Sequence, residues 1–140
     1  MKKREVYEDR YTSYWRESND DTVFIKYTPE LEITLPIAKN LVRSRLEYTK
    51  NQPHYTIIDF TNVLKVEKAA RDYMNHPEFG LKNIIAGAFV SNSIIGVLFI
   101  NLYLKINKPY VPAKFFQTRE EAVSYIQELR QSNATKTNES

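Results

Sequence analysis

The chain has no cysteine, and only three glycines and two histidines occur among its 140 residues. Without cysteine, disulfide bonds, thiolate zinc sites and cysteine catalysis are excluded, and a reducing cytosol is the natural compartment. The scattered glycines form neither a Gly-x-Gly-x-x-Gly motif nor a Walker phosphate loop. His54 and His76 stand far apart without neighbouring ligand residues, so we expect no metal site. No serine lies in a nucleophile elbow, and we therefore expect no catalytic residues, no enzyme activity and no cofactor.

Long apolar runs and strong net charge are missing too. The most apolar segment, 94–104, falls far short of the ~20 residues of a membrane span and predicts a buried helix. The basic first four residues precede no apolar core, which argues against export. A net charge of only +3 gives little attraction to nucleic acid. We expect a cytoplasmic protein with no transmembrane segment and no specific nucleic-acid partner.

The length suits one domain, and a hydrophobic content of 42% can form its core without disulfides or metals. Residues 1–10 are charged and aperiodic, which predicts a flexible leader. Residues 132–140 are rich in Ser, Asn, Thr and Lys and predict a disordered tail. The domain itself is expected to occupy residues 11–131.

Polar turn formers at 17–21 separate two apolar segments, 11–15 and 22–27, and this pattern predicts an opening hairpin. The segments that follow predict strands at 54–59, 83–90 and 114–116, and helices from Thr34 to about 50, at 67–74, at 93–106 and after Thr118. Alternating strands and helices favour right-handed crossovers and parallel pairing. The predicted fold class is α/β, with one mixed, mostly parallel sheet, an N-terminal hairpin and about four helices.

The element order resembles the STAS/SpoIIAA-like fold over about residues 20–130. The segments that carry a closer resemblance, to small uncharacterised STAS/SEC14-like proteins of the Bacteroidetes type, are 57–63, 69–73, 104–112 and 116–122, of which 105–112 is the most specific. The resemblance implies a SpoIIAA-like fold. It supports the fold more than a particular function.

In that family a regulatory serine is phosphorylated at the start of the helix after the third strand, in an Asp-Ser-Ser-Gly-like stretch. Here residues 67–70 read Glu-Lys-Ala-Ala, without a hydroxyl. This departure argues against a phospho-switch and against a literal anti-sigma-antagonist role.

Several polar residues follow the predicted strands at the sheet edge where open α/β folds bind ligands. Helix starts at the same edge favour anions. These residues could form a ligand or partner rim, or they could satisfy backbone groups in turns and caps. The candidate rim residues are Asp59, Thr61, Ser91, Asn92, Ser93, Thr118 and Arg119.

The apolar helix carries large apolar side chains beside its polar stripe of Asn101 and Lys105, which predicts an interface unless other elements cover it. The candidate interface residues are Ile94, Val97, Leu98 and Leu104. A nearby basic cluster could contact phosphates or simply be solvated. It consists of Lys105, Lys108 and Lys114.

These features favour a non-catalytic protein-binding or regulatory domain that contacts a protein partner or forms a homodimer. One alternative is a SEC14-like domain for a small apolar molecule or lipid, which would need an interior cavity of about 300–1,000 Å³. A weaker alternative is an enzyme that uses Asp59.

Overall fold

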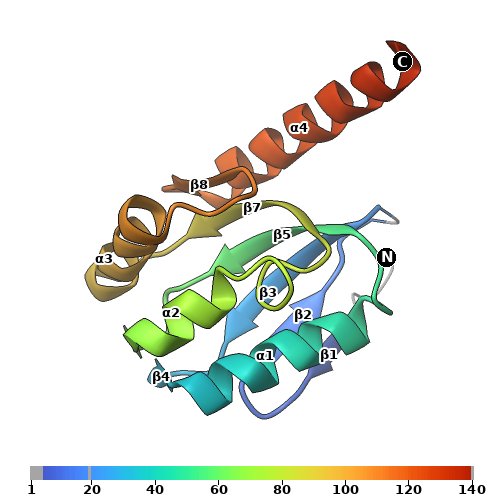
Figure 1. The fold of residues 1–140 in the computed structure, drawn as a ribbon. Coiled ribbons are helices and arrows are strands. Elements are labelled where there is room, and N and C mark those ends of the chain that lie inside the picture. The colour runs from blue at the N-terminus through green and yellow to red at the C-terminus, as the bar shows by residue number, and fades with distance from the viewer. Residues whose placement is uncertain (1–4, 19, 140) are drawn as a thin grey trace.

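The computed structural model describes residues 5–18 and 20–139, with side chains up to residue 134, and a mixed six-stranded sheet forms its middle layer (Figure 1). Its strands, in spatial order, are β1 (Val6–Glu8), β2 (Thr12–Trp15), β3 (Thr22–Tyr27), β5 (His54–Asp59), β7 (Ile84–Val90) and β8 (Ala113–Phe116). The first three strands pair antiparallel, and the pairings from β3 to β8 are parallel. The predicted mostly parallel sheet with an opening hairpin is confirmed.

The described helices number four, as predicted. They are α1 (Leu35–Tyr48), α2 (Lys68–Met74), α3 (Ile94–Leu102), which continues into the π-helical turn η1 (Tyr103–Asn107), and α4 (Arg119–Glu139). Figure 1 shows α1 and α2 on one side of the sheet, α4 on the other, and α3 at the end towards which β5 and β7 point. This arrangement places α3 at the carboxyl edge of the parallel strands.

Local capping explains where the helices begin. The Thr34 hydroxyl accepts the Ile37 N–H at 3.4 Å, and the Ser93 hydroxyl accepts the Gly96 N–H at 3.3 Å. Such bonds satisfy N–H groups that have no partner within the helix. Helix α1 ends at Tyr48, slightly earlier than expected, because Lys50 adopts a φ of 54°, which is incompatible with a continuing right-handed helix.

Three features differ from the sequence expectation. Strand β1 lies within the expected leader and pairs with β2. Strands β4 (Leu31–Ile33) and β6 (Val63–Val66) form a separate two-stranded parallel sheet, which the sequence pattern did not predict. Residues 132–139, expected to be disordered, continue helix α4, and the Asn133 amide donates to the Tyr55 hydroxyl at 3.0 Å.

The central strands bury side chains on both faces, which explains their nearly continuous apolar sequences. The larger core joins Ile25, Ile58 and Phe89 to residues of α1, α2 and α3. The second core joins Ile57 and Ala88 to Ala122 and Ile126 of α4. Among the described residues, no helix combines the length and apolar character that a membrane span needs.

Candidate functional site

The structure brings five of the predicted rim residues together where β5 and β7 end. The Thr61 N–H donates to Asp59 Oδ1 at 2.8 Å, and the Asn92 N–H donates to Thr61 Oγ1 at 3.0 Å. In the next turn, the Ser93 N–H donates to Ser91 Oγ at 3.0 Å. The two loops are therefore tied together, and each of these oxygens accepts a backbone N–H. The geometry corresponds to turn and capping chemistry.

Thr118 and Arg119 make their contacts elsewhere, at the start of α4. The Thr118 hydroxyl accepts the Glu121 N–H at 3.2 Å and donates to the Glu121 carboxylate at 2.9 Å. The Arg119 guanidinium lies 4.8 Å from the centre of the Phe24 ring and forms an ion pair with Glu17. Both residues thus cap and anchor α4 on the face of the sheet that this helix covers.

The outer side of α3 exposes large apolar side chains. Ile94 is 90% exposed and Leu98 63%, while Val97 and Leu104 are half-buried. We call the exposed apolar group on α3, η1 and the following loop the α3 surface, and it consists of Ile94, Ile95, Leu98, Ile106 and Tyr110. Helix α3 was expected to be buried, so this exposure corrects that expectation.

A narrow contact explains why so little of α3 is buried. Only Gly96 and Ile100, four residues apart and hence on one side of the helix, are buried. At Gly96 the helix comes so close to the loops that a Cβ would stand 2.4 Å from Ser91 Oγ and 2.5 Å from the Phe60 carbonyl oxygen. Glycine is therefore required there, while Ile94 and Leu98 on the outer side of α3 remain exposed.

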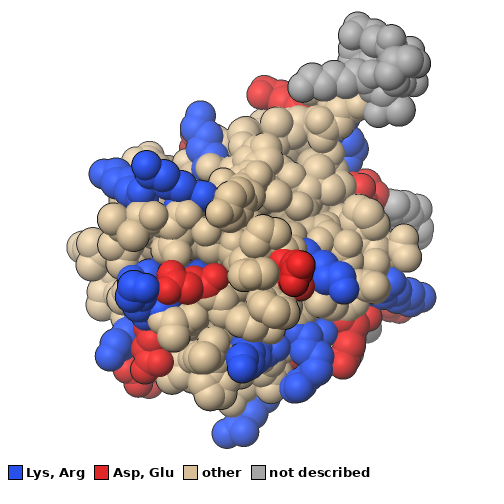
Figure 2. All heavy atoms as spheres, in the orientation of Figure 1, with Lys and Arg blue, Asp and Glu red and all other residues tan. Residues whose placement is uncertain are grey.

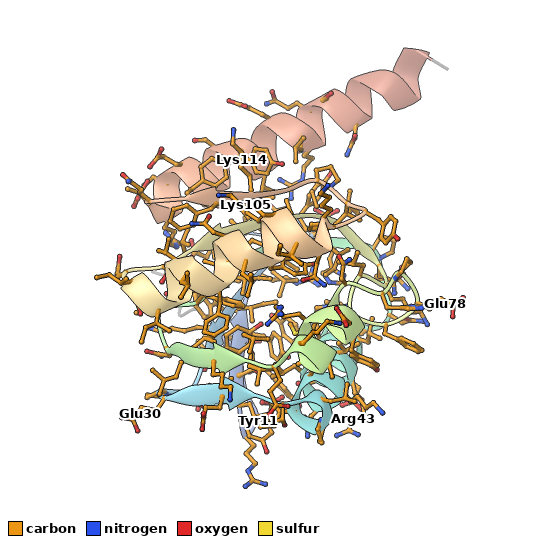
Figure 3. The ribbon with its side chains drawn as sticks, turned by 60° about the vertical axis from the view of Figure 1, so that its left-hand side comes forward. Tyr11, Glu30, Arg43, Glu78, Lys105 and Lys114 are labelled. Carbon is orange, nitrogen blue, oxygen red and sulfur yellow. The ribbon has the colours of Figure 1, made fainter. Side chains whose placement is uncertain are left out.

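The basic cluster lies beside the α3 surface. Figure 3 shows Lys105 and Lys114 above α3, and Glu30 on the opposite side of the helix, beyond the small sheet. Figure 2 shows Lys and Arg side chains gathered over the same region between α3 and β8. Lys108 adopts a φ of 49° where η1 ends. The apolar surface is consequently bordered by positive charge on one side.

A cavity of about 80 Å³ lies between the sheet, α1, α2 and η1. Apolar side chains dominate its wall, including Ile58, Phe89 and Phe99. Arg45, Thr56 and Arg71 also line it. This volume is well below the about 300–1,000 Å³ of typical pockets for drug-sized ligands.

The sequence pattern did not single out Arg45, although it contained a signal. Arg45 follows Leu41 by four residues and precedes Tyr48 by three, so it lies on the apolar side of α1. It is 6% exposed. A charged residue at a core-facing helical position was the feature that could have identified it.

Titratable groups offer no evident catalytic arrangement in the part of the chain that the structure describes, and no three His, Cys, Asp or Glu residues there could hold a metal ion. His54 is fully buried, and burial lowers its pKa to about 4. Its Nδ1 lies 2.8 Å from the Gln52 carbonyl oxygen, which fixes the proton on that nitrogen. His54 is thus a neutral structural residue, while His76 is exposed in the loop after α2.

Helix α2 begins at Lys68, in the segment where the sequence resemblance to STAS proteins would place a regulatory serine. Glu67 precedes the helix without a side-chain capping bond, and Lys68 pairs with Asp72 at 2.8 Å on the surface. The hydrogen bond from Lys68 lowers the pKa of the Asp72 carboxyl group. No hydroxyl stands at this helix start to receive a phosphate.

A family model described as "Domain of unknown function (DUF7793)" matches residues 14–130. No curated protein sequence matches the chain. The chain is similar in structure to an uncharacterised protein of the DUF3478 family with a SpoIIAA-like fold from Shewanella loihica PV-4, with a TM-score of 0.55 and 16% sequence identity. That similarity covers 89% of this chain and 96% of the other, and at this identity it supports the SpoIIAA-like fold alone.

Proposed function

The chain belongs to the DUF7793 family of domains of unknown function, and from this premise we propose that it is a non-catalytic binding domain that pairs with a second copy through the α3 surface. The observation that carries the proposal is the exposure of Ile94 and Leu98, at 90% and 63%. Burying apolar area stabilises by about 25 cal/mol per Å². A contiguous group of such side chains on one helix is typical of an interaction surface.

The charges around the α3 surface favour a second copy as the occupant. Lys105 and Lys114 lie on one side of α3 and Glu30 on the other (Figure 3). A two-fold axis that lies in this face, perpendicular to the line from the lysines to Glu30, would place the lysines of each copy opposite Glu30 of its partner. Two-fold pairing is the commonest symmetry of homo-oligomers, and opposite charges at the rim would set its register.

Two other functions receive less support. A lipid carrier would need a larger interior than the cavity of about 80 Å³. Asp59 Oδ1 accepts the Thr61 N–H at 2.8 Å, a turn contact that accounts for this residue without a catalytic role.

The oligomeric state tests the proposal. Size-exclusion chromatography with light scattering should give a concentration-dependent mass approaching twice the 16.5 kDa of the chain. Leu98→Glu should yield a monomer with an unchanged circular dichroism spectrum, because a buried unpaired carboxylate at the interface is strongly unfavourable. Val6→Glu is the matched control, since Val6 is an exposed apolar residue on β1, at the opposite edge of the sheet from β8.

A charge exchange distinguishes two-fold pairing from other contacts. Lys105→Glu and Glu30→Lys should each weaken the dimer, and the double variant should restore much of the affinity. A wild-type monomer at every accessible concentration would reject the homodimer. If that monomer instead sedimented with anionic phosphatidylglycerol vesicles but not with phosphatidylcholine vesicles, the α3 surface would be a lipid-docking site.

A further inference from the structure

Arg45 and Arg71 line one apolar cavity without a counter-charge among the described residues. Arg45, on α1, is almost completely buried, and Arg71, on α2, is half-buried. No Asp or Glu stands in the cavity wall, and none of the ion pairs found in the described part of the chain includes either arginine. Two positively charged side chains therefore line a space of about 80 Å³.

Both guanidinium groups and a neighbouring hydroxyl keep unused hydrogen-bonding capacity. Arg45 Nη2 donates to the Lys82 carbonyl oxygen at 2.9 Å, and Arg71 Nη1 donates to the Val66 carbonyl oxygen at 2.9 Å. Buried Nε atoms of both arginines have no partner among the described residues. Thr56 Oγ1, also in the cavity wall, is fully buried and equally unpartnered within the described chain.

A buried donor without an acceptor and a buried charge without a partner both destabilise a folded protein. One carboxylate could accept hydrogen bonds at both of its oxygens from guanidinium groups and from the Thr56 hydroxyl. Its negative charge would also offset the two positive charges.

We propose that this cavity binds a small monocarboxylate with a short apolar body. The carboxylate would lie against Arg45, Arg71 and Thr56, and the apolar body against Ile58, Phe89 and Phe99. The volume, well below that of pockets for drug-sized ligands, favours a ligand of a few non-hydrogen atoms. The apolar wall disfavours inorganic phosphate, which has no apolar part to bury.

Thermal shift and amide chemical shifts with defined probes test the site. Sodium butyrate, added at constant ionic strength, should raise the Tm of the wild-type protein in a saturable manner and shift the Thr56 and Gly87 amide resonances. Butyramide, which has the same size without the charge, should do neither. Octanoate should bind more weakly than butyrate, because its longer chain exceeds the cavity.

Variants distinguish binding of butyrate in this cavity from a general attraction of the anion to basic residues. Arg45→Met should weaken butyrate binding at least about tenfold, since hydrogen bonds to charged groups are the strong ones. Arg43→Met is the matched control, because Arg43 lies on the outer side of α1 (Figure 3) and is exposed; its affinity should equal that of the wild type. If Arg45→Met does not fold, Thr56→Val carries the same test with a nearly unchanged shape.

Three results would overturn the assignment. One is that butyrate changes neither the Tm nor the amide chemical shifts of the wild-type protein. Another is an equal response to butyrate and butyramide, or equal affinity in the wild type and in Thr56→Val and Arg45→Met. The third is tighter binding of octanoate than of butyrate, which would indicate that the site binds the carboxylate of a longer fatty acid.

Discussion

His54 occupies the first position of β5 and exposes no surface. Its neutral form is maintained because burial disfavours the imidazolium ion, while Nδ1 is held by the Gln52 carbonyl oxygen. Its other nitrogen, Nε2, has no partner among the described residues. A proton on Nε2 would therefore create an unpartnered buried charge.

The stability of the protein should consequently fall in mild acid. The pKa of His54 is about 4 in the folded protein and about 6.5 in the unfolded chain, so the unfolded chain binds the proton first as the pH drops. The His54 contribution is complete above pH ~6.5 and is lost as the pH falls towards ~4, by about 3 kcal/mol in all. Urea unfolding across this range measures it.

Replacing each histidine by glutamine provides the comparison. His54→Gln should lack the part of the pH dependence that lies between ~4 and ~6.5. His76→Gln should retain it, because His76 is exposed. Equal slopes in the wild type and in His54→Gln would contradict the assignment.

At the scale of the element, α3 combines a tight attachment with an exposed outer side. Gly96 is the point of closest approach, where the helix meets Ser91 and the Phe60 carbonyl group. Ile100, one turn later, is completely buried. The outer side chains therefore project from a helix whose position is firmly set, which suits a preorganised contact surface.

Gly96→Ala should destabilise the protein although alanine favours helix. The added methyl group would lie 2.5 Å from a backbone carbonyl oxygen, so α3 or the loop must shift, at a cost of about 1–3 kcal/mol. Chemical denaturation measures this loss. Asn101→Ala, at an exposed position of the same helix, should change stability by less than about 0.5 kcal/mol. If Gly96→Ala were as stable as the wild type, the contact between α3 and the Phe60 carbonyl group would have to be looser than the structure shows.

At the scale of the whole molecule, one residue near the end of the domain ties it to the beginning. Arg130, on α4, pairs with Asp21 at 2.8 Å and also hydrogen-bonds the Thr22 hydroxyl. Its guanidinium lies 4.8 Å from the centre of the Tyr55 ring. Helix α4 is thereby fixed to the amino ends of β3 and β5, far from its own start at β8.

Arg130→Met should weaken the attachment of α4 to the amino ends of β3 and β5. The variant keeps the apolar stem but loses the charged hydrogen bonds, so we expect a loss of about 1–3 kcal/mol, discounted towards the lower value because the pair with Asp21 is partly exposed to solvent. Differential scanning calorimetry would register a lower Tm. Arg43→Met, which removes an exposed arginine from α1, should leave the Tm nearly unchanged. If the Tm of Arg130→Met matched that of this control, apolar packing alone would hold α4 on the sheet.

Local patterns were sufficient for much of the architecture. The hairpin, the strand at 54–59 and the caps at Thr34, Ser93 and Thr118 follow from turn formers, apolar runs and hydroxyl side chains, whose effects act over a few residues. Strands β4 and β6 were not predictable in this way. Each has only three or four residues and exists because the other lies beside it.

The sequence by itself determined the α/β class, the order of the main elements and the lack of cysteine chemistry, because periodicity, capping and composition are properties of neighbouring residues. Only the tertiary structure decided which side of α3 is covered and that Arg45 and Arg71 line one cavity. These outcomes depend on contacts between segments distant in the chain. Burial depends on which elements pack together, and a local sequence pattern does not predict which surface remains exposed.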